Sequence, residues 1–133
     1  MDGVLNSKES PKIKVKFKGP FTEPQEFEAI IDTGFTGAVS MPLVRALPLG
    51  LILYSTATFI LADGSKEFFY LCLGEAFLGS IQKMIVISLS KGNDVLLGTE
   101  FLSVFKVNLK LDYENNRFTL NPASPQLPLI KGQ

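Results

Sequence analysis

The sequence predicts a single all-β domain, a closed barrel of short strands with one or two short helices. Two observations lead to this fold class. Apolar and polar residues alternate in several segments, which is typical of strands, and clusters of Gly, Pro, Asn and Asp separate those segments as turns. A length of 133 residues is that of one domain. Hydrophobic residues make up 46% and charged residues 20% of the chain, a balance that permits a folded core.

The first half of the chain contains the clearest alternation. Four lysines alternate with Ile13, Val15 and Phe17, so they share one face of a strand, either solvated or guarding a sheet edge. Further strands are expected at residues 27–31 and 38–41. One helical turn is expected at 42–47, because Pro42 suits a helix start and Pro48 with Gly50 ends it.

The second half begins with a predicted hairpin. Strands at 56–62 and 66–73 flank Asp63-Gly64, a strong signal for a tight turn. Another strand is expected at 81–89, and residues 94–102 mix strand and short-helix character. The last predicted strands, 105–111 and 118–120, flank a turn at Asn115-Asn116.

The ends of the chain are expected to lie outside this domain. Residues 1–11 are predicted to be a flexible segment and residues 12–121 the folded domain. Prolines recur in residues 122–133, which predicts a loosely ordered tail because proline cannot donate to a strand ladder.

Composition excludes several function classes. The chain has no histidine, which removes Ser-His-Asp and Cys-His catalysis and the commonest metal ligand. Its one cysteine, Cys72, lies in an apolar run and is expected to be a small buried residue. We therefore expect no metal and no cofactor. The formal net charge of zero gives no sign of nucleic acid binding. Without an apolar leader or a long apolar run, we expect no membrane contact and a cytoplasmic location.

Carboxylates remain as candidate catalytic groups, and one of them has a distinctive context. Asp32-Thr33-Gly34 follows the apolar residues Ala29 to Ile31. Average composition gives such a tripeptide by chance in roughly a few per cent of chains this long, so the triplet alone is suggestive. A carboxylate at a buried strand end is costly unless it is hydrogen-bonded or paired. A second apolar segment that ends in glycine, 95–98, lies downstream.

Taken in order, Asp32-Thr33-Gly34, the Asp63-Gly64 hairpin and Leu96-Leu97-Gly98 resemble the retropepsin-like aspartic proteases. The chain is similar in particular to small prokaryotic members with Asp-Thr-Gly-Phe, over about residues 12 to 121. The resemblance implies the closed barrel of the acid protease fold, with one lobe per chain. It also implies an aspartic endopeptidase that acts as a homodimer on extended polypeptide.

The resemblance also assigns roles to residues. Asp32 is expected to be the catalytic carboxylate, Thr33 to brace the two active-site loops across the dimer, and Gly34 to bind the substrate backbone. The turn at Ala62, Asp63, Gly64 and Ser65 is expected to be the flap that covers substrate. Leu96, Leu97 and Gly98 are expected to pack beside the active-site loop.

The sequence departs from the family pattern at three positions. Phe35 stands where a small residue is usual in the retroviral enzymes. Family members usually pair an arginine after the second glycine with an aspartate two residues after Asp-Thr-Gly, and here Thr99 and Thr36 stand at those positions. Since both charges are absent together, no charge is left buried without its partner. The departure predicts a scaffold that survives, with a looser dimer.

Two alternatives stay open. A non-catalytic relative would keep the barrel as a peptide-binding or dimerisation module, recognising extended peptide by strand addition. An unrelated small β-barrel would carry the triplet by chance. The intact Asp-Thr-Gly argues against a pure binding module, which has no need of a buried carboxylate at that position.

Overall fold

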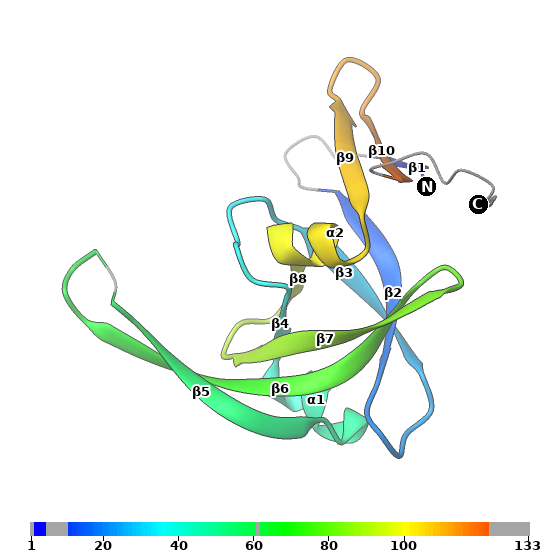
Figure 1. The fold of residues 1–133 in the computed structure, drawn as a ribbon. Helices are drawn as coiled ribbons and strands as arrows, with labels where there is room; N and C mark the ends of the chain where they lie inside the picture. Colours follow the sequence, from blue (N-terminus) through cyan, green and yellow to red (C-terminus); the bar gives the residue numbers. More distant parts are fainter. Residues whose placement is uncertain (1, 5–10, 61, 123–133) are drawn as a thin grey trace, which may run out of the picture.

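The fold is described from a computed structural model, in which residues 2–4, 11–60 and 62–122 are described (Figure 1). In chain order the elements are β1 (Asp2–Val4), β2 (Lys12–Lys18), β3 (Gln25–Ile31), β4 (Val39–Pro42), α1 (Leu43–Ala46), the 3₁₀ helix η1 (Leu47–Leu49), β5 (Ile52–Ile60), β6 (Lys66–Leu78), β7 (Ile81–Ser90), β8 (Val95–Leu97), α2 (Thr99–Val104), β9 (Val107–Asp112) and β10 (Arg117–Pro122). The fold class predicted from the sequence is confirmed.

Within the described residues, six strands close into a barrel, in the order β2-β3-β8-β4-β7-β6 and back to β2. The closing contact is the antiparallel pairing of β6 with β2, in which Lys18 is opposite Glu75. Strand β5 pairs only with β6 among the described strands, so the β5–β6 hairpin extends beyond the barrel wall (Figure 1).

Alternation along the strands sets the barrel core. In β2, Ile13, Val15 and Phe17 are buried, whereas Lys12, Lys14 and Lys16 lie on the exposed face. The lysines therefore form a solvated face. Strand β3 pairs with β2 along 12–17, whereas β6 pairs with it only along 16–18. Among the described strands, Lys12 and Lys14 therefore lie on a stretch of β2 that is paired on one side, where they can also guard an edge. Largest among the fully buried side chains are Phe17, Phe101, Phe118, Ile31, Met41, Leu49, Ile87 and Leu97.

Strand β6 is longer than the sequence predicted. The expected strand ended at Leu73, before Gly74, but the ladder continues to Leu78. It continues because β7 pairs with β6 along 71–78 and β2 pairs with 75–77, after the β5 pairing ends at Leu73. Glycine is suited to this crowded point, because a Cβ on Gly74 would lie 2.7 Å from the Leu51 side chain.

The helical segments are short, as the sequence predicted. Pro42 precedes α1, and the chain continues through Pro48 in η1 before Gly50 ends it with a left-handed φ of 61°. The segment 94–102, with its mixed signals, divides into β8 and α2 around Gly98. Phe105, expected to begin a strand, instead caps the carboxyl end of α2 and packs on Phe101 at 4.6 Å between ring centroids.

The two chain ends differ from the expectation where they are described. Residues 2–4, within the segment expected to be flexible, form β1, which pairs with β10 beside β9 in a separate three-stranded sheet. A strand of three residues is too short to show alternation, so its pairing comes from the partner strand. The predicted tail at 123–133 lies outside the described residues.

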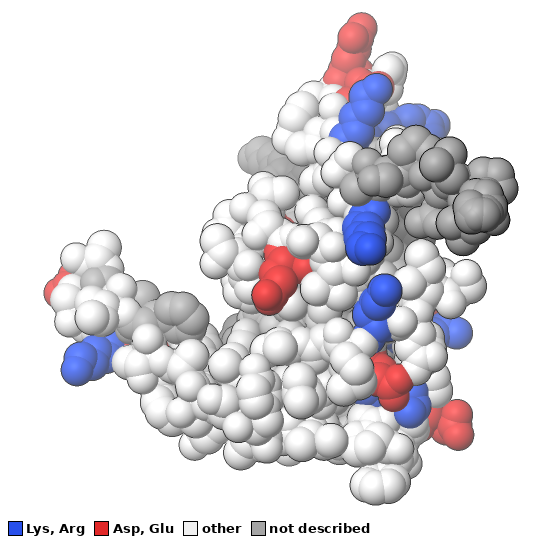
Figure 2. Space-filling view, viewed as in Figure 1, with Lys and Arg blue, Asp and Glu red and all other residues white. Residues whose placement is uncertain are grey.

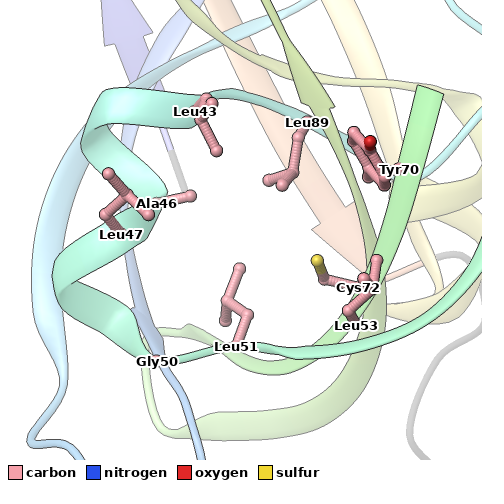
Figure 3. A pocket seen from close by; sticks show the side chains of 9 residues that line it. All are labelled: Leu43, Ala46, Leu47, Gly50, Leu51, Leu53, Tyr70, Cys72 and Leu89. Atoms are coloured by element: carbon pink, nitrogen blue, oxygen red, sulfur yellow. The ribbon is translucent and has the colours of Figure 1, made fainter. Parts of the chain in front are cut away.

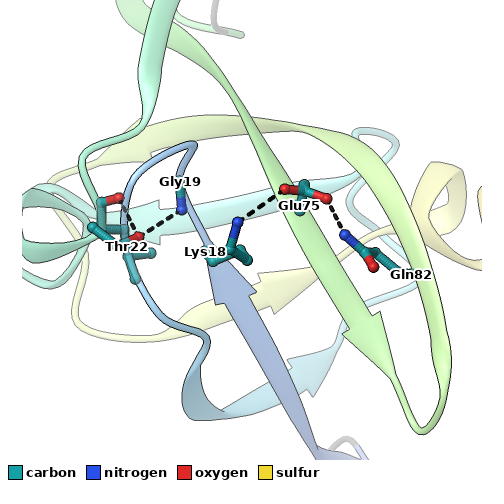
Figure 4. Close-up of polar contacts among 6 residues, drawn as sticks. Lys18, Gly19, Thr22, Glu75 and Gln82 are labelled. Atoms are coloured by element: carbon teal, nitrogen blue, oxygen red, sulfur yellow. Dashed lines mark hydrogen bonds and ion pairs between the residues drawn. The ribbon is translucent and has the colours of Figure 1, made fainter.

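A row of polar contacts crosses the closing seam between β2 and β6 (Figure 4). The Lys18 ammonium lies 3.2 Å from Glu75 Oε1, and Gln82 donates to Oε2 of the same carboxylate. Nearby, the Gly19 amide donates to Thr22 Oγ1, and this hydroxyl donates to the Leu49 carbonyl, each at 2.9 Å. These contacts tie the seam and the β2–β3 turn to neighbouring elements.

The Glu75 carboxylate is expected to stabilise the folded protein at neutral pH and to lose this effect in acid. The hydrogen bond from Gln82 and the contacts with Lys18 lower the pKa of Glu75 from its ordinary value. A carboxylate whose pKa is lower in the folded state than in the unfolded state stabilises the protein at pH values above the unfolded-state pKa. This contribution is lost as pH falls through the folded-state pKa. We expect Glu75→Gln to lower Tm at pH 7, with the difference from wild type closing in acid.

Thermal unfolding followed from pH 7 to pH 3 measures this effect. Glu26→Gln is the matched control, because Glu26 faces Lys14 at 3.9 Å with 51% of its own side chain exposed. By contrast, the Glu75 side chain is 24% exposed. Equal Tm shifts for the two variants at every pH would contradict a specific role for the seam carboxylate.

Candidate active site

Asp32 is the first residue beyond β3, at a point where two distant segments meet. Strands β3 and β8 pair in parallel, with Ile31 opposite Leu97, so the next residues, Asp32 and Gly98, are neighbours. The Asp32 amide donates to the Leu97 carbonyl at 2.9 Å. Because β3 and β4 flank β8 on its two sides, the loop at residues 32–38 passes over the end of β8.

The Asp32 carboxylate is half-buried and held by its own loop. Its Oδ1 accepts a hydrogen bond from the Gly34 amide at 2.9 Å, and its carbonyl accepts one from the Phe35 amide at 3.1 Å. Thr33 and Gly34 are exposed. The loop therefore fixes the carboxylate while leaving the next two residues open to a partner or a ligand.

Gly98 is required by the close approach of the 32–38 loop. A Cβ at this position would lie 2.1 Å from the Gly37 carbonyl oxygen and 2.4 Å from that of Phe35, contacts that real Cβ atoms do not make. The Gly98 amide in turn donates to the Ala38 carbonyl at 2.9 Å. Of the two leucines expected beside the loop, Leu97 is fully buried and Leu96 is half-buried.

The two threonines that replace the usual ion pair lie next to each other. The Thr99 hydroxyl donates to the Thr36 carbonyl at 3.4 Å, and the Thr99 amide donates to the Phe35 carbonyl at 2.9 Å. Neutral hydrogen bonds thus join the loop to the start of α2 at the two positions noted as departures in the sequence.

Sequence reasoning noted Phe35 only as a departure and missed its packing. The ring lies against Gly37 and Gly98, at distances that leave no room for a Cβ on either. The sequence does place Gly37 two residues after Phe35. It gives no local sign of the contact with Gly98, which is distant in the chain.

The predicted flap residues form the tip of the β5–β6 hairpin. Asp63 Oδ1 accepts hydrogen bonds from the Ser65 amide at 2.9 Å and the Ser65 hydroxyl at 2.6 Å, which lower the pKa of Asp63. Gly64 has a left-handed φ of 85°, and Ala62 is exposed. The tip is therefore a hydrogen-bonded turn at the end of a projecting hairpin.

An apolar cavity of about 490 Å³ lies at the base of this hairpin (Figure 3). Its lining residues are Leu43, Ala46, Leu47, Gly50, Leu51, Leu53, Tyr70, Cys72 and Leu89. Cys72 is 3% exposed, and burial raises the pKa of its thiol, as expected for a small core residue. None of these residues belongs to the 32–38 loop or to β8, so the cavity is not the candidate active site.

Two features are absent from the described residues, 2–4, 11–60 and 62–122. In that part of the chain, no group of three His, Cys, Asp or Glu side chains is placed to hold a metal ion. Nor does any helix there have the length and apolar character needed to cross a membrane.

Comparison with known proteins supports the fold. No family model and no curated protein sequence matches the chain. Among solved structures, a retropepsin-like aspartic protease from Rickettsia conorii is similar with a TM-score of 0.64 and 18% identity, over 92% of this chain and 90% of that one. The simian foamy virus (mac) protease is similar with a TM-score of 0.54 and 13% identity, over 70% of this chain and 92% of that one. The chain therefore has the retropepsin-like aspartic protease fold.

Proposed function

We propose that the protein is an aspartic endopeptidase whose catalytic group is Asp32. The observation that carries this proposal is the position of its carboxylate, at the end of β3 beside Gly98, held by the Gly34 amide in a retropepsin-like barrel. The two solved structures named above are proteases by name. The chemistry also suits a chain without histidine.

The reaction needs two carboxylates in different protonation states. Two aspartates a few ångströms apart cannot both ionise cheaply, so they share one proton and titrate as a pair. The ionised carboxylate takes a proton from a water molecule, whose oxygen attacks the scissile carbonyl carbon. The protonated carboxylate donates to the carbonyl oxygen, and proton transfer to the amide nitrogen then allows the C–N bond to break.

A homodimer supplies the second carboxylate. The chain contains Asp-Thr-Gly once, and Asp2, Asp63, Asp94 and Asp112 lack this context. A two-fold axis close to Asp32 would place the residue against its own copy. The exposure of Thr33 and Gly34 on the same loop supports this arrangement, because both stay available for contacts across the axis. The cytoplasmic location stays a prediction from the sequence.

The test is incubation of the purified protein with an unfolded polypeptide over a range of pH. Cleavage with a bell-shaped pH dependence is expected, since one carboxylate must be ionised and the other protonated. An uncleaved polypeptide that nevertheless binds would instead indicate a peptide-binding module.

The β5–β6 hairpin is proposed to be the flap. It projects from the barrel, and the face over β5 and β6 in Figure 2 carries few charged side chains. Phe68 and Tyr70 on β6 are 56% and 48% exposed and stack edge to face at 5.3 Å. Tyr70 also lines the apolar cavity at the base of the hairpin, so the proposal of a flap rests on the projection of the hairpin and on the tight Gly64 turn at its tip.

Peptide binding is therefore expected to slow amide hydrogen exchange in the hairpin. The probe is a peptide with a hydroxyl-bearing mimic of the tetrahedral intermediate, and protection should rise across residues 58–70. Amides of 75–77, in the same strand but paired on both sides within the barrel, serve as the internal control. Unchanged protection across 58–70 at a peptide concentration that saturates binding would contradict the flap.

A further inference from the structure

The Phe35 ring fills a slot made by two glycines that approach it from different parts of the chain. A Cβ on Gly37 would lie 2.7 Å from ring atom Cζ and 2.9 Å from Cε1. A Cβ on Gly98 would lie 2.7 Å from ring atom Cδ2. The ring is half-buried, so it packs between the 32–38 loop and the start of α2.

The backbone of Phe35 is tied at the same place. Its amide donates to the Asp32 carbonyl at 3.1 Å, and its carbonyl accepts from the Thr99 amide at 2.9 Å. One residue therefore links the carboxylate-bearing end of the loop to the first residue of α2. The ring packed in the slot restricts rotation of the Phe35 backbone, because the side chain and the two hydrogen-bonded peptide groups must move together.

We propose that Phe35 is a positioning residue that holds Asp32 at the distance its partner carboxylate requires. It does so in place of the ion pair that is absent at Thr36 and Thr99, where the hydroxyl contact of 3.4 Å is a weak neutral bond. A positioning role matters here because small displacements of reacting groups cost large factors in rate. This inference rests on the proposed protease function for its catalytic part, whereas the packing of the ring stands independently.

The test is a double-mutant cycle of Phe35→Ala, Gly37→Ala and the double variant. Phe35→Ala is expected to lower kcat by about tenfold to a hundredfold, with a smaller change in KM. A longer distance between the two carboxylates weakens their coupling, so the two apparent pKa values of the pH–rate profile should move toward each other. A merely structural loss would reduce the amount of active enzyme without moving these values.

Gly37→Ala is expected to displace the ring and so to reproduce the Phe35→Ala defect. Among the described residues, the three atoms nearest to a Cβ on Gly37, its chain neighbours apart, all belong to the Phe35 ring. The double variant should therefore be no worse than Phe35→Ala alone. Gly98→Ala is the matched control. Its Cβ also meets the carbonyl oxygens of Gly37 and Phe35, so it should stay harmful when the ring is removed.

Amide exchange at Phe35 and Thr99 provides a second measurement that needs no activity. Exchange at these amides should be faster in both single variants, with no further increase in the double variant. This result supports the proposal even if the wild-type protein cleaves no peptide. In that case only the proposed protease function fails. Additive effects in the cycle would overturn the proposal. The proposal would also be overturned if the Phe35→Ala variant kept the wild-type rates of amide exchange at Phe35 and Thr99. Where cleavage is measurable, the two apparent pKa values of its pH–rate profile would then also equal those of the wild type.

Discussion

Replacing Asp32 with asparagine is expected to abolish cleavage, by on the order of 10⁴-fold or more, because neither subunit then has a general base or acid. The fold should persist, since the asparagine amide oxygen can still accept the Gly34 N–H that now bonds Asp32 Oδ1. Cleavage of an unfolded polypeptide and the thermal unfolding curve are measured on the same preparation. A large loss of activity with an unchanged Tm would assign chemistry, and not stability, to this carboxylate.

Asp112→Asn is the matched control. This aspartate lies at the end of β9, where its carboxylate accepts hydrogen bonds from the Asn115 amide and side chain. Its replacement removes one carboxylate outside the 32–38 loop and should leave cleavage at the wild-type rate. Full proteolysis by a clean Asp32→Asn preparation would sink the assignment of Asp32.

Mixing wild-type with excess Asp32→Asn subunits is expected to poison the activity. Each hybrid dimer has one native carboxylate and one amide, and this pair cannot share the proton that the reaction needs. With random pairing and a ninefold excess of variant, activity per wild-type subunit should fall about tenfold, because few wild-type subunits retain a wild-type partner. Mass-labelled subunits establish that exchange is complete before activity is measured.

The control for this experiment is the same excess of Asp112→Asn subunits, which should leave activity per wild-type subunit unchanged. If cleavage instead tracks the wild-type concentration after exchange with Asp32→Asn, a single chain suffices for catalysis. Sedimentation that finds an active monomer would lead to the same rejection of the dimer mechanism.

Local patterns determined a large part of this fold. The alternation of lysines with Ile13, Val15 and Phe17 predicted β2 and its buried face, because a strand with one buried face must repeat every two residues. The Asp63-Gly64 turn predicted the hairpin, and its glycine does take a positive φ. The sequence also placed Asp32 at the end of a buried strand, since Ile31 is almost fully buried.

Only the tertiary structure decided which segments meet at Asp32. The parallel pairing of β3 with β8 joins residues that are far apart in the chain, and such a contact leaves no local periodicity to read. The same holds for the extension of β6 to Leu78, which depends on partners from β2 and β7. Likewise, the slot for Phe35 forms only once Gly98 is brought against the loop. Side-chain spacing predicts an element and its buried face, whereas contacts between elements depend on how the whole barrel closes.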